Sequence, residues 1–80
     1  MSRNEIINKL NEILRDIFDN QNIEVNEKTI ADDIEDWDSL AQVRIVVACE
    51  AQFRTKFDLN DIAIFNNIGN IADLIERKLR

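Results

Sequence analysis

Isoleucine and leucine recur at steps of three and four residues near the start of this chain, and this spacing restricts its fold more than any other feature. The apolar positions of this stretch are Ile6, Ile7, Leu10, Ile13, Leu14, Ile17 and Phe18. They line one face of a helix, so we predict a helix over roughly residues 3–19. Ser2 and Glu5 form a capping-box pattern that would satisfy two backbone amides at its start.

The same spacing returns twice later in the chain. It predicts a central helix over residues 39–54 and a last helix over residues 68–79, which Asn67 would cap. The central helix carries two adjacent apolar rows, Leu40, Val43, Val47 and Ala51 in one and Val46, Cys49 and Phe53 in the other. We expect so wide an apolar face to contact two neighbouring helices or to line a ligand cavity as well as a core. The inner face of the last helix comprises Ile68, Ile71, Ala72, Ile75 and Leu79.

A short third helix is predicted between these two segments. Asn60 or Asp61 would cap a turn that holds Ile62, Ile64 and Phe65. The composition also favours helices, because 80 residues include no proline, one glycine and no tyrosine. A chain of this length buries only about 60% of its unfolded surface, which leaves no room for a deep catalytic cleft. We therefore predict one all-α domain over residues 1–80, a four-helix bundle with a long first loop and a short third helix.

Cysteine and histidine counts exclude two kinds of stabilising site. Cys49 is the only cysteine and the chain has no histidine, so neither a disulfide nor a Cys/His zinc site can form. Cys49 lies on the apolar face of the central helix and is interpreted as a core residue rather than a reactive thiol. The acidic run over residues 32–38 lacks the glycine of a calcium-binding EF-hand loop, so we expect no metal site.

The N-terminal residues lack the apolar core of a signal peptide, and no apolar run approaches the roughly 18 residues of a membrane span. We therefore expect a cytoplasmic protein with no membrane span.

The segment from residue 20 to residue 38 has no sustained period and is long for a loop in so small a domain. Isolated apolar residues should anchor it to the bundle: Ile23, Val25, Ile30, Ile34 and Trp37. Residues 19–38 hold eight acids and one lysine, whereas the remaining residues are close to neutral. This charge argues against a nucleic-acid partner and favours a basic protein partner. The alternative is a solvated loop whose charge only keeps the protein soluble.

Ser39 lies where the acidic run ends and the central helix begins. A nucleophilic serine needs a base, usually histidine or lysine, to take its proton. This chain has no histidine, and no lysine lies within ten residues of Ser39 in sequence. Any reaction at the hydroxyl must therefore be carried out by another protein, and the serine would accept a group. The alternative is that Ser39 only caps the helix.

Asp38-Ser39-Leu40, with Phe53 fourteen positions after the serine and Asn67-Ile68-Gly69-Asn70-Ile71-Ala72-Asp73-Leu74-Ile75 near the C-terminus, resembles the acyl carrier proteins over nearly the whole chain. The resemblance implies that 4′-phosphopantetheine is attached covalently to Ser39. It also implies that Asp38 and Leu40 belong to the cofactor site and that Leu40 and Val43 pack beside the arm. An acyl chain on the arm would enter between the central helix and the two helices that follow it.

The implied function is to carry acyl groups as thioesters between the enzymes of fatty-acid, polyketide or other specialised biosynthesis, without catalysis by the chain itself. The implied partners are a phosphopantetheinyl transferase and enzymes that transfer or modify the acyl group, and we expect a monomer. One alternative is an aminoacyl or peptidyl carrier, although these usually present Gly-Gly-x-Ser where this chain has Asp36-Trp37-Asp38-Ser39. Another is an unmodified acidic helical adaptor. Trp37 is interpreted mainly as an anchor of the loop.

The central helix departs from the family in its charge. Family members commonly carry several acids on the exposed face of this helix, where partner enzymes dock through basic residues. The matching positions here are Ala41, Arg44, Glu50 and Ala51, followed by Arg54. We therefore predict that the acids of the first loop, rather than this helix, attract a basic partner.

Overall fold

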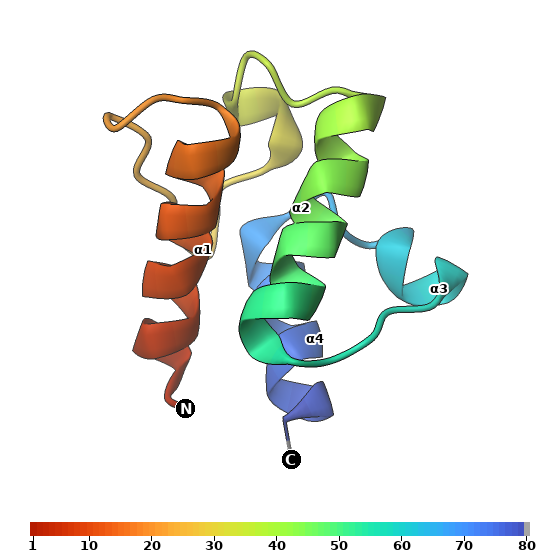
Figure 1. The fold of residues 1–80 in the computed structure, drawn as a ribbon. Coiled ribbons are helices and arrows are strands. Elements are labelled where there is room, and N and C mark those ends of the chain that lie inside the picture. The colour runs from red at the N-terminus through yellow and green to blue at the C-terminus, as the bar shows by residue number, and fades with distance from the viewer. Residues whose placement is uncertain (80) are drawn as a thin grey trace.

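The computed structural model describes residues 1–79 and consists of helices joined by irregular segments (Figure 1). The elements are α1 (Arg3–Ile17), a short 3-10 helix η1 (Ala31–Asp33), α2 (Ser39–Phe53), α3 (Leu59–Ile62) and α4 (Ile68–Lys78). Within residues 1–79 the chain forms no β-strand and one isolated β-bridge, between Ile30 and Asn67. The predicted all-α fold with four helices, a long first loop and a short third helix is confirmed.

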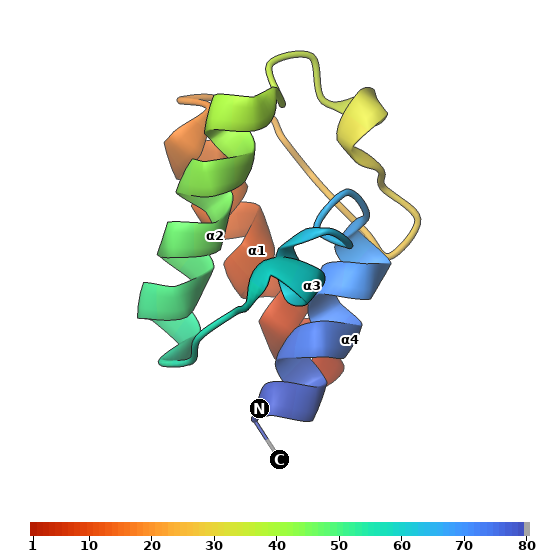
Figure 2. The same cartoon turned by 90° about the vertical axis from the view of Figure 1, so that its right-hand side faces the viewer.

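The three long helices form the body of the molecule. α1 packs against both α2 and α4. Figures 1 and 2 show α3 as a short turn lying across the space between α2 and α4, while the first loop covers the end of the bundle opposite the N-terminus. No helix within residues 1–79 is both long and apolar enough to cross a membrane.

The helix starts follow their capping residues. Ser2 accepts from the Glu5 amide and Glu5 accepts from the Ser2 amide, which confirms the capping box of α1. Asn67 caps α4, as predicted, and accepts from the Asn70 amide at 3.1 Å.

The predicted cap of α3 is wrong. Asp58, rather than Asn60 or Asp61, is the N-cap, and its carboxylate accepts from the Asp61 amide at 2.9 Å. The Asp61 carboxylate in turn accepts from the Asp58 amide at 3.0 Å, so the two acids form a reciprocal cap three residues apart. Ile64 and Phe65 consequently lie beyond the helix, which ends at Ile62.

The core is built from apolar residues of α1, α2 and α4, together with Val25 and Phe65: Ile6, Leu10, Ile13, Leu14, Val25, Ile45, Val46, Cys49, Phe53, Phe65, Ile68, Ile71, Ala72, Leu74 and Ile75. Of the two apolar rows predicted for α2, only the one with Val46, Cys49 and Phe53 is buried. The other faces solvent, with Leu40 68%, Val43 58% and Val47 58% exposed. The prediction that both rows pack inward is wrong, because α3 has only four residues and covers little of α2. Leu79 at the end of α4 is also exposed, contrary to its predicted place on the inner face.

The first loop is fixed to α1 by two polar side chains. The Val25 amide donates to Asn11 Oδ1 at 2.7 Å, and Asn11 Nδ2 donates to the Val25 carbonyl at 3.3 Å. Arg15 Nε donates to the Ile23 carbonyl at 2.6 Å. Val25 is buried and Ile23 packs against the core, so both anchors are confirmed.

The middle of the loop is held by α4 through its backbone. The Ile68 amide donates to the Thr29 carbonyl at 2.9 Å, and the Gly69 amide donates to the Glu27 carbonyl at 3.2 Å. These loop carbonyls satisfy amides that the first turn of a helix leaves unpaired. Ile30, predicted to be an apolar anchor, is 40% exposed. The backbone around it, rather than its side chain, holds the loop in place.

Candidate functional site

Asp38 starts α2 and leaves Ser39 as the first helical residue. Asp38 has an extended backbone, and its carboxylate accepts from the Ala41 amide at 2.8 Å. The Asp38 carbonyl accepts the first bond of the helix, from the Gln42 amide. The cap is therefore the aspartate, so the alternative that Ser39 serves only as a helix cap is wrong.

The Ser39 side chain is exposed at this helix start. Its hydroxyl makes no hydrogen bond to any side chain or backbone group of residues 1–79, so nothing in this region acts as its general base. With no histidine anywhere in the chain, this site has an accessible hydroxyl but no means of activating it. That Ser39 accepts a group attached by another protein stays a prediction, with which the free and exposed hydroxyl agrees.

Trp37 fixes the backbone immediately before Ser39. Its ring packs against Phe18 with centroids 6.4 Å apart, and its Nε1 donates to Gln42 Oε1 at 2.6 Å. Gln42 Nε2 in turn donates to the Ile62 carbonyl at the end of α3, at 3.4 Å. Trp37 is thus an anchor, as predicted, and the Gln42 amide links the loop, α2 and α3. Sequence reasoning did not identify Gln42, because one glutamine on a helix carries no signal of its partners.

The apolar residues that follow Ser39 do not form an enclosed pocket for an arm. Leu40 and Val43 project to solvent, and Val47 extends the same exposed row by one further turn. No other part of residues 1–79 encloses Leu40 and Val43. Their packing beside an arm therefore stays a prediction. Exposed apolar rows of this kind are typical of surfaces that contact other proteins.

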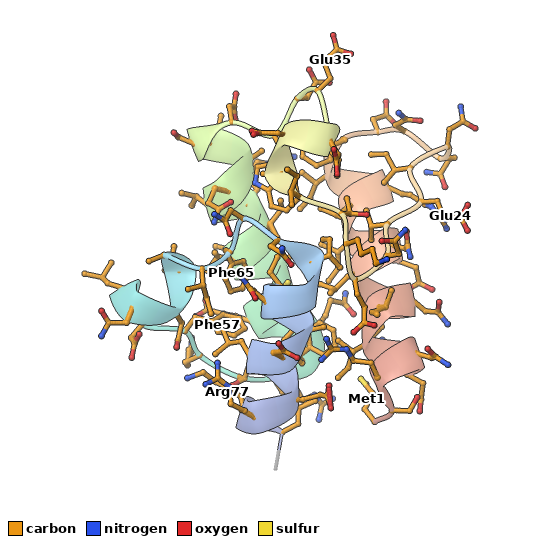
Figure 3. The ribbon with its side chains drawn as sticks, turned by 180° about the vertical axis from the view of Figure 1, so that it is seen from behind. Met1, Glu24, Glu35, Phe57, Phe65 and Arg77 are labelled. Atoms are coloured by element: carbon orange, nitrogen blue, oxygen red, sulfur yellow. The ribbon has the colours of Figure 1, made fainter. Side chains whose placement is uncertain are left out.

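Charge is distributed unevenly around Ser39. The first loop presents Glu24, Asp32, Glu35 and Asp36 to solvent, and Figure 3 shows Glu35 projecting from the turn that leads into α2. On α2, Arg44 is exposed, as is Arg54 at its end. Glu50 is half-buried, and its carboxylate accepts from the Phe57 amide at 2.9 Å. The exposed face of α2 is therefore not acidic, whereas the loop before Ser39 is.

Cys49 is interpreted correctly as a core residue. The side chain is fully buried between the helices. Burial raises the pKa of the thiol to about 12, because the thiolate would lose its hydration, and the nearby Glu50 charge acts in the same direction. Cys49 is thus protonated at neutral pH and takes no part in the site.

Comparison with known proteins decides the family. No protein-family model matches the chain. A protein named Acyl carrier protein from Acidothermus cellulolyticus is 32% identical over 76 residues, which cover 94% of this chain and 89% of that protein. The chain belongs to the acyl carrier protein family. Its fold is also similar to the solution NMR structure of holo acyl carrier protein from Geobacter metallireducens, with a TM-score of 0.85 and 35% identity over 92% of this chain and 85% of that one.

Family membership agrees with the absence of a base at the serine. Acyl carrier proteins are carriers rather than enzymes, and this chain is one of them. The resemblance predicted from Asp38-Ser39-Leu40, Phe53 and residues 67–75 is confirmed.

Proposed function

We propose that this acyl carrier protein bears 4′-phosphopantetheine on the Ser39 hydroxyl, joined through a phosphodiester, and carries acyl groups on that arm. The observation that supports this most directly is the exposed Ser39 hydroxyl at a helix start that Asp38 already caps. The hydroxyl is free to be esterified, because no backbone amide of α2 donates a hydrogen bond to it.

The residues present fit such a group. The open helix start leaves space for a long substituent, and the exposed Leu40 and Val43 offer an apolar surface along which it could lie. When bound, the arm supplies a thiol that holds the cargo as a thioester. The positive end of the α2 dipole attracts the phosphate of the arm, whereas the Asp38 carboxylate next to it repels that phosphate. We propose that this opposition keeps the arm mobile.

The partners that follow from this role are a phosphopantetheinyl transferase and enzymes that transfer or modify acyl groups. We propose that residues 1–80 act as a single carrier domain, as a cytoplasmic monomer, in fatty-acid, polyketide or other specialised biosynthesis. An aminoacyl or peptidyl carrier is the second candidate. Asp36-Trp37-Asp38-Ser39 favours the acyl carrier, because it does not have the Gly-Gly-x-Ser typical of peptidyl carriers.

The test is modification of the purified protein by a broad-specificity phosphopantetheinyl transferase with coenzyme A, followed by intact mass. We expect one phosphopantetheine adduct on the wild type and none on Ser39→Ala. Because Asp38 is the cap, Ser39→Ala should fold normally, and circular dichroism checks this. A folded wild type that gains no adduct would favour the unmodified adaptor instead, and an adduct that persists on Ser39→Ala would show that the group is attached at another residue.

A further inference from the structure

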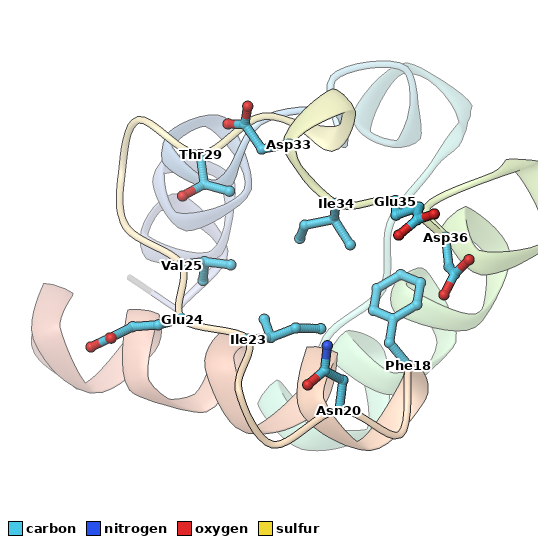
Figure 4. Close-up of a pocket in the computed structure, with 10 residues that line it drawn as sticks. All are labelled: Phe18, Asn20, Ile23, Glu24, Val25, Thr29, Asp33, Ile34, Glu35 and Asp36. Carbon is cyan, nitrogen blue, oxygen red and sulfur yellow. The ribbon is translucent and has the colours of Figure 1, made fainter.

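A hollow of about 290 Å³ lies between the end of α1 and the first loop (Figure 4). Its apolar lining comes from Phe18, Ile23, Val25 and Ile34, all of which also pack in or against the core. Its volume lies just below the roughly 300–1,000 Å³ of pockets that hold whole small molecules. The hollow is therefore of a size for one long side chain rather than for a drug-sized ligand.

Carboxylates surround the opening of this hollow, but only two of them are both close to the apolar lining and uncommitted. Asp33 accepts from the Ile30 amide at 3.0 Å, and Figure 4 shows Glu24 directed away from the centre. The Glu35 and Asp36 side chains are exposed, and neither carboxylate accepts a hydrogen bond or forms an ion pair within residues 1–79. Both line the hollow together with Phe18, and Figure 4 draws all three on one side of it. One side of the hollow thus combines an aromatic ring with two free negative charges.

We infer that this hollow binds an arginine side chain of a partner protein that works at Ser39, an inference that rests on the proposed carrier function. An arginine has a long apolar stem and a charged, planar head, which match the Ile34 and Phe18 lining and the Glu35 and Asp36 carboxylates. Its guanidinium can bond two carboxylate oxygens at once and stack on an aromatic ring. Lysine carries its charge on a compact ammonium, which has neither the fixed fork of donors nor the planar face of a guanidinium, so arginine is the better occupant.

The position of the hollow suits an anchor for a partner acting on the serine. Asp36 lines it and precedes Ser39 by three residues, while the intervening Trp37 packs against Phe18. An arginine seated there would hold the partner's surface beside the Ser39 hydroxyl. Arginine is also among the residues most often found to dominate binding at protein interfaces.

The first experiment tests the hollow without any partner, using the unmodified full chain and n-butylguanidinium as the probe. We expect saturable amide shifts in two-dimensional NMR at Ile23, Ile34 and Asp36, and a change in the fluorescence of Trp37, the only tryptophan. n-Butylammonium should bind more weakly, and guanidinium alone, without the apolar stem, should give no localised shifts.

Charge-neutralising variants then separate the anchor from general attraction. The double variant Glu35→Gln, Asp36→Asn should weaken binding of n-butylguanidinium about tenfold, because it removes charge-assisted hydrogen bonds. Asp32→Asn is the matched control, because it is an exposed acid of the same loop that does not line the hollow, and it should weaken binding less than twofold. Equal weakening by both variants, or no saturable shifts in the wild type, would overturn the inference.

The second experiment asks whether a protein supplies the arginine. The double variant should lower kcat/KM for modification by the transferase about tenfold, and Asp32→Asn should lower it less than twofold. The double variant could lose probe binding and yet be modified at the wild-type rate. This result would overturn the assignment to a partner's side chain and would indicate that the hollow binds a small cationic ligand instead. A wild type that is never modified would instead contradict the proposed function, while the probe titration would still test the hollow.

Discussion

Gly69 shows how one residue fixes the distance between the first loop and α4. A Cβ added at this position would lie 2.7 Å from the Glu27 carbonyl oxygen, which accepts the Gly69 amide. Backbone cannot move aside as a flexible side chain can, so the loop approaches this closely only because residue 69 lacks a side chain. The glycine is required for contact, not for an unusual backbone angle, since it is helical.

We predict that Gly69→Ala destabilises the protein by about 1–3 kcal/mol, because the methyl group forces the loop away from α4. An alanine in an unhindered helix would instead stabilise by about 1 kcal/mol, so the sign of the effect is diagnostic. Urea denaturation of the unmodified protein measures it. Asn70→Ala, at the exposed neighbouring position, is the control and should change stability by less than about 0.5 kcal/mol. A stabilised Gly69→Ala variant would contradict the contact with Glu27.

Asn11 is the only polar residue buried among those described in residues 1–79. Its side chain pairs with both backbone groups of Val25, in place of the solvent that this buried segment has lost. We predict that Asn11→Leu destabilises by about 1–3 kcal/mol, because the buried Val25 amide loses its partner. Hydrogen exchange should also speed up at Val25.

Asn8→Leu provides the comparison, because Asn8 is exposed on the same helix. It should leave both the stability and the exchange at Val25 close to wild type. If Asn11→Leu is as stable as wild type, the apolar gain of leucine outweighs the lost hydrogen bonds and the loop is held by other contacts.

At the scale of elements, α2 has apolar residues on nearly its whole surface but buries only part of them. Ile45, Val46, Cys49 and Phe53 face the core, whereas Val47 and its neighbours in the row face solvent. Beyond α3, Phe65 is fully buried and meets Phe57 edge-to-face at 5.0 Å; Figure 3 labels both rings. Cargo that enters between α2, α3 and α4 must therefore displace packed side chains.

We predict that a medium-chain acyl form melts at a higher temperature than the holo form, because its chain enters the core beside Ile62, Phe65, Ile68 and Ile71. Each CH₂ removed from water contributes about 0.8 kcal/mol, against which the rearrangement of these side chains must be set. Thermal unfolding of the two forms, followed by circular dichroism, makes the comparison. Equal melting temperatures would show that the cargo stays outside.

At the scale of the whole molecule, charge is divided between two adjoining surfaces. The acidic first loop leads into Ser39, and the exposed face of α2, with Arg44 and Arg54, leads away from it. Attraction between exposed charges is screened over roughly 8 Å at physiological salt, so the surface nearest the serine has the greatest influence on a docking partner. That surface is the loop.

We predict that Glu35→Lys or Asp36→Lys slows modification by the transferase, mainly through the association rate and most strongly at low salt. Glu50→Lys should have little effect on the rate. Because Glu50 binds the Phe57 amide, the variants must first be shown to be folded at the assay temperature. A larger effect from Glu50→Lys, or loop effects that do not depend on salt, would place the main docking surface on α2.

The sequence by itself determined the helices, because their apolar spacing and caps are local. The α1 capping box, the Asn67 cap and the apolar faces of α1 and α4 follow from residues three or four apart. The position of Ser39 at a helix start, and the absence of any histidine to activate it, could also be predicted from the chain alone.

Only the tertiary structure decided which apolar row of α2 is buried, because burial depends on what the other helices cover, and α3 is too short to cover both rows. It also decided that Asn11 binds Val25 and that Gln42 joins Trp37 to Ile62. The hollow beside Glu35 and Asp36 belongs to the same class, because it forms where α1 meets a loop that has no periodic pattern. Each of these features depends on residues brought together from different segments, and one-dimensional spacing carries no information about such encounters.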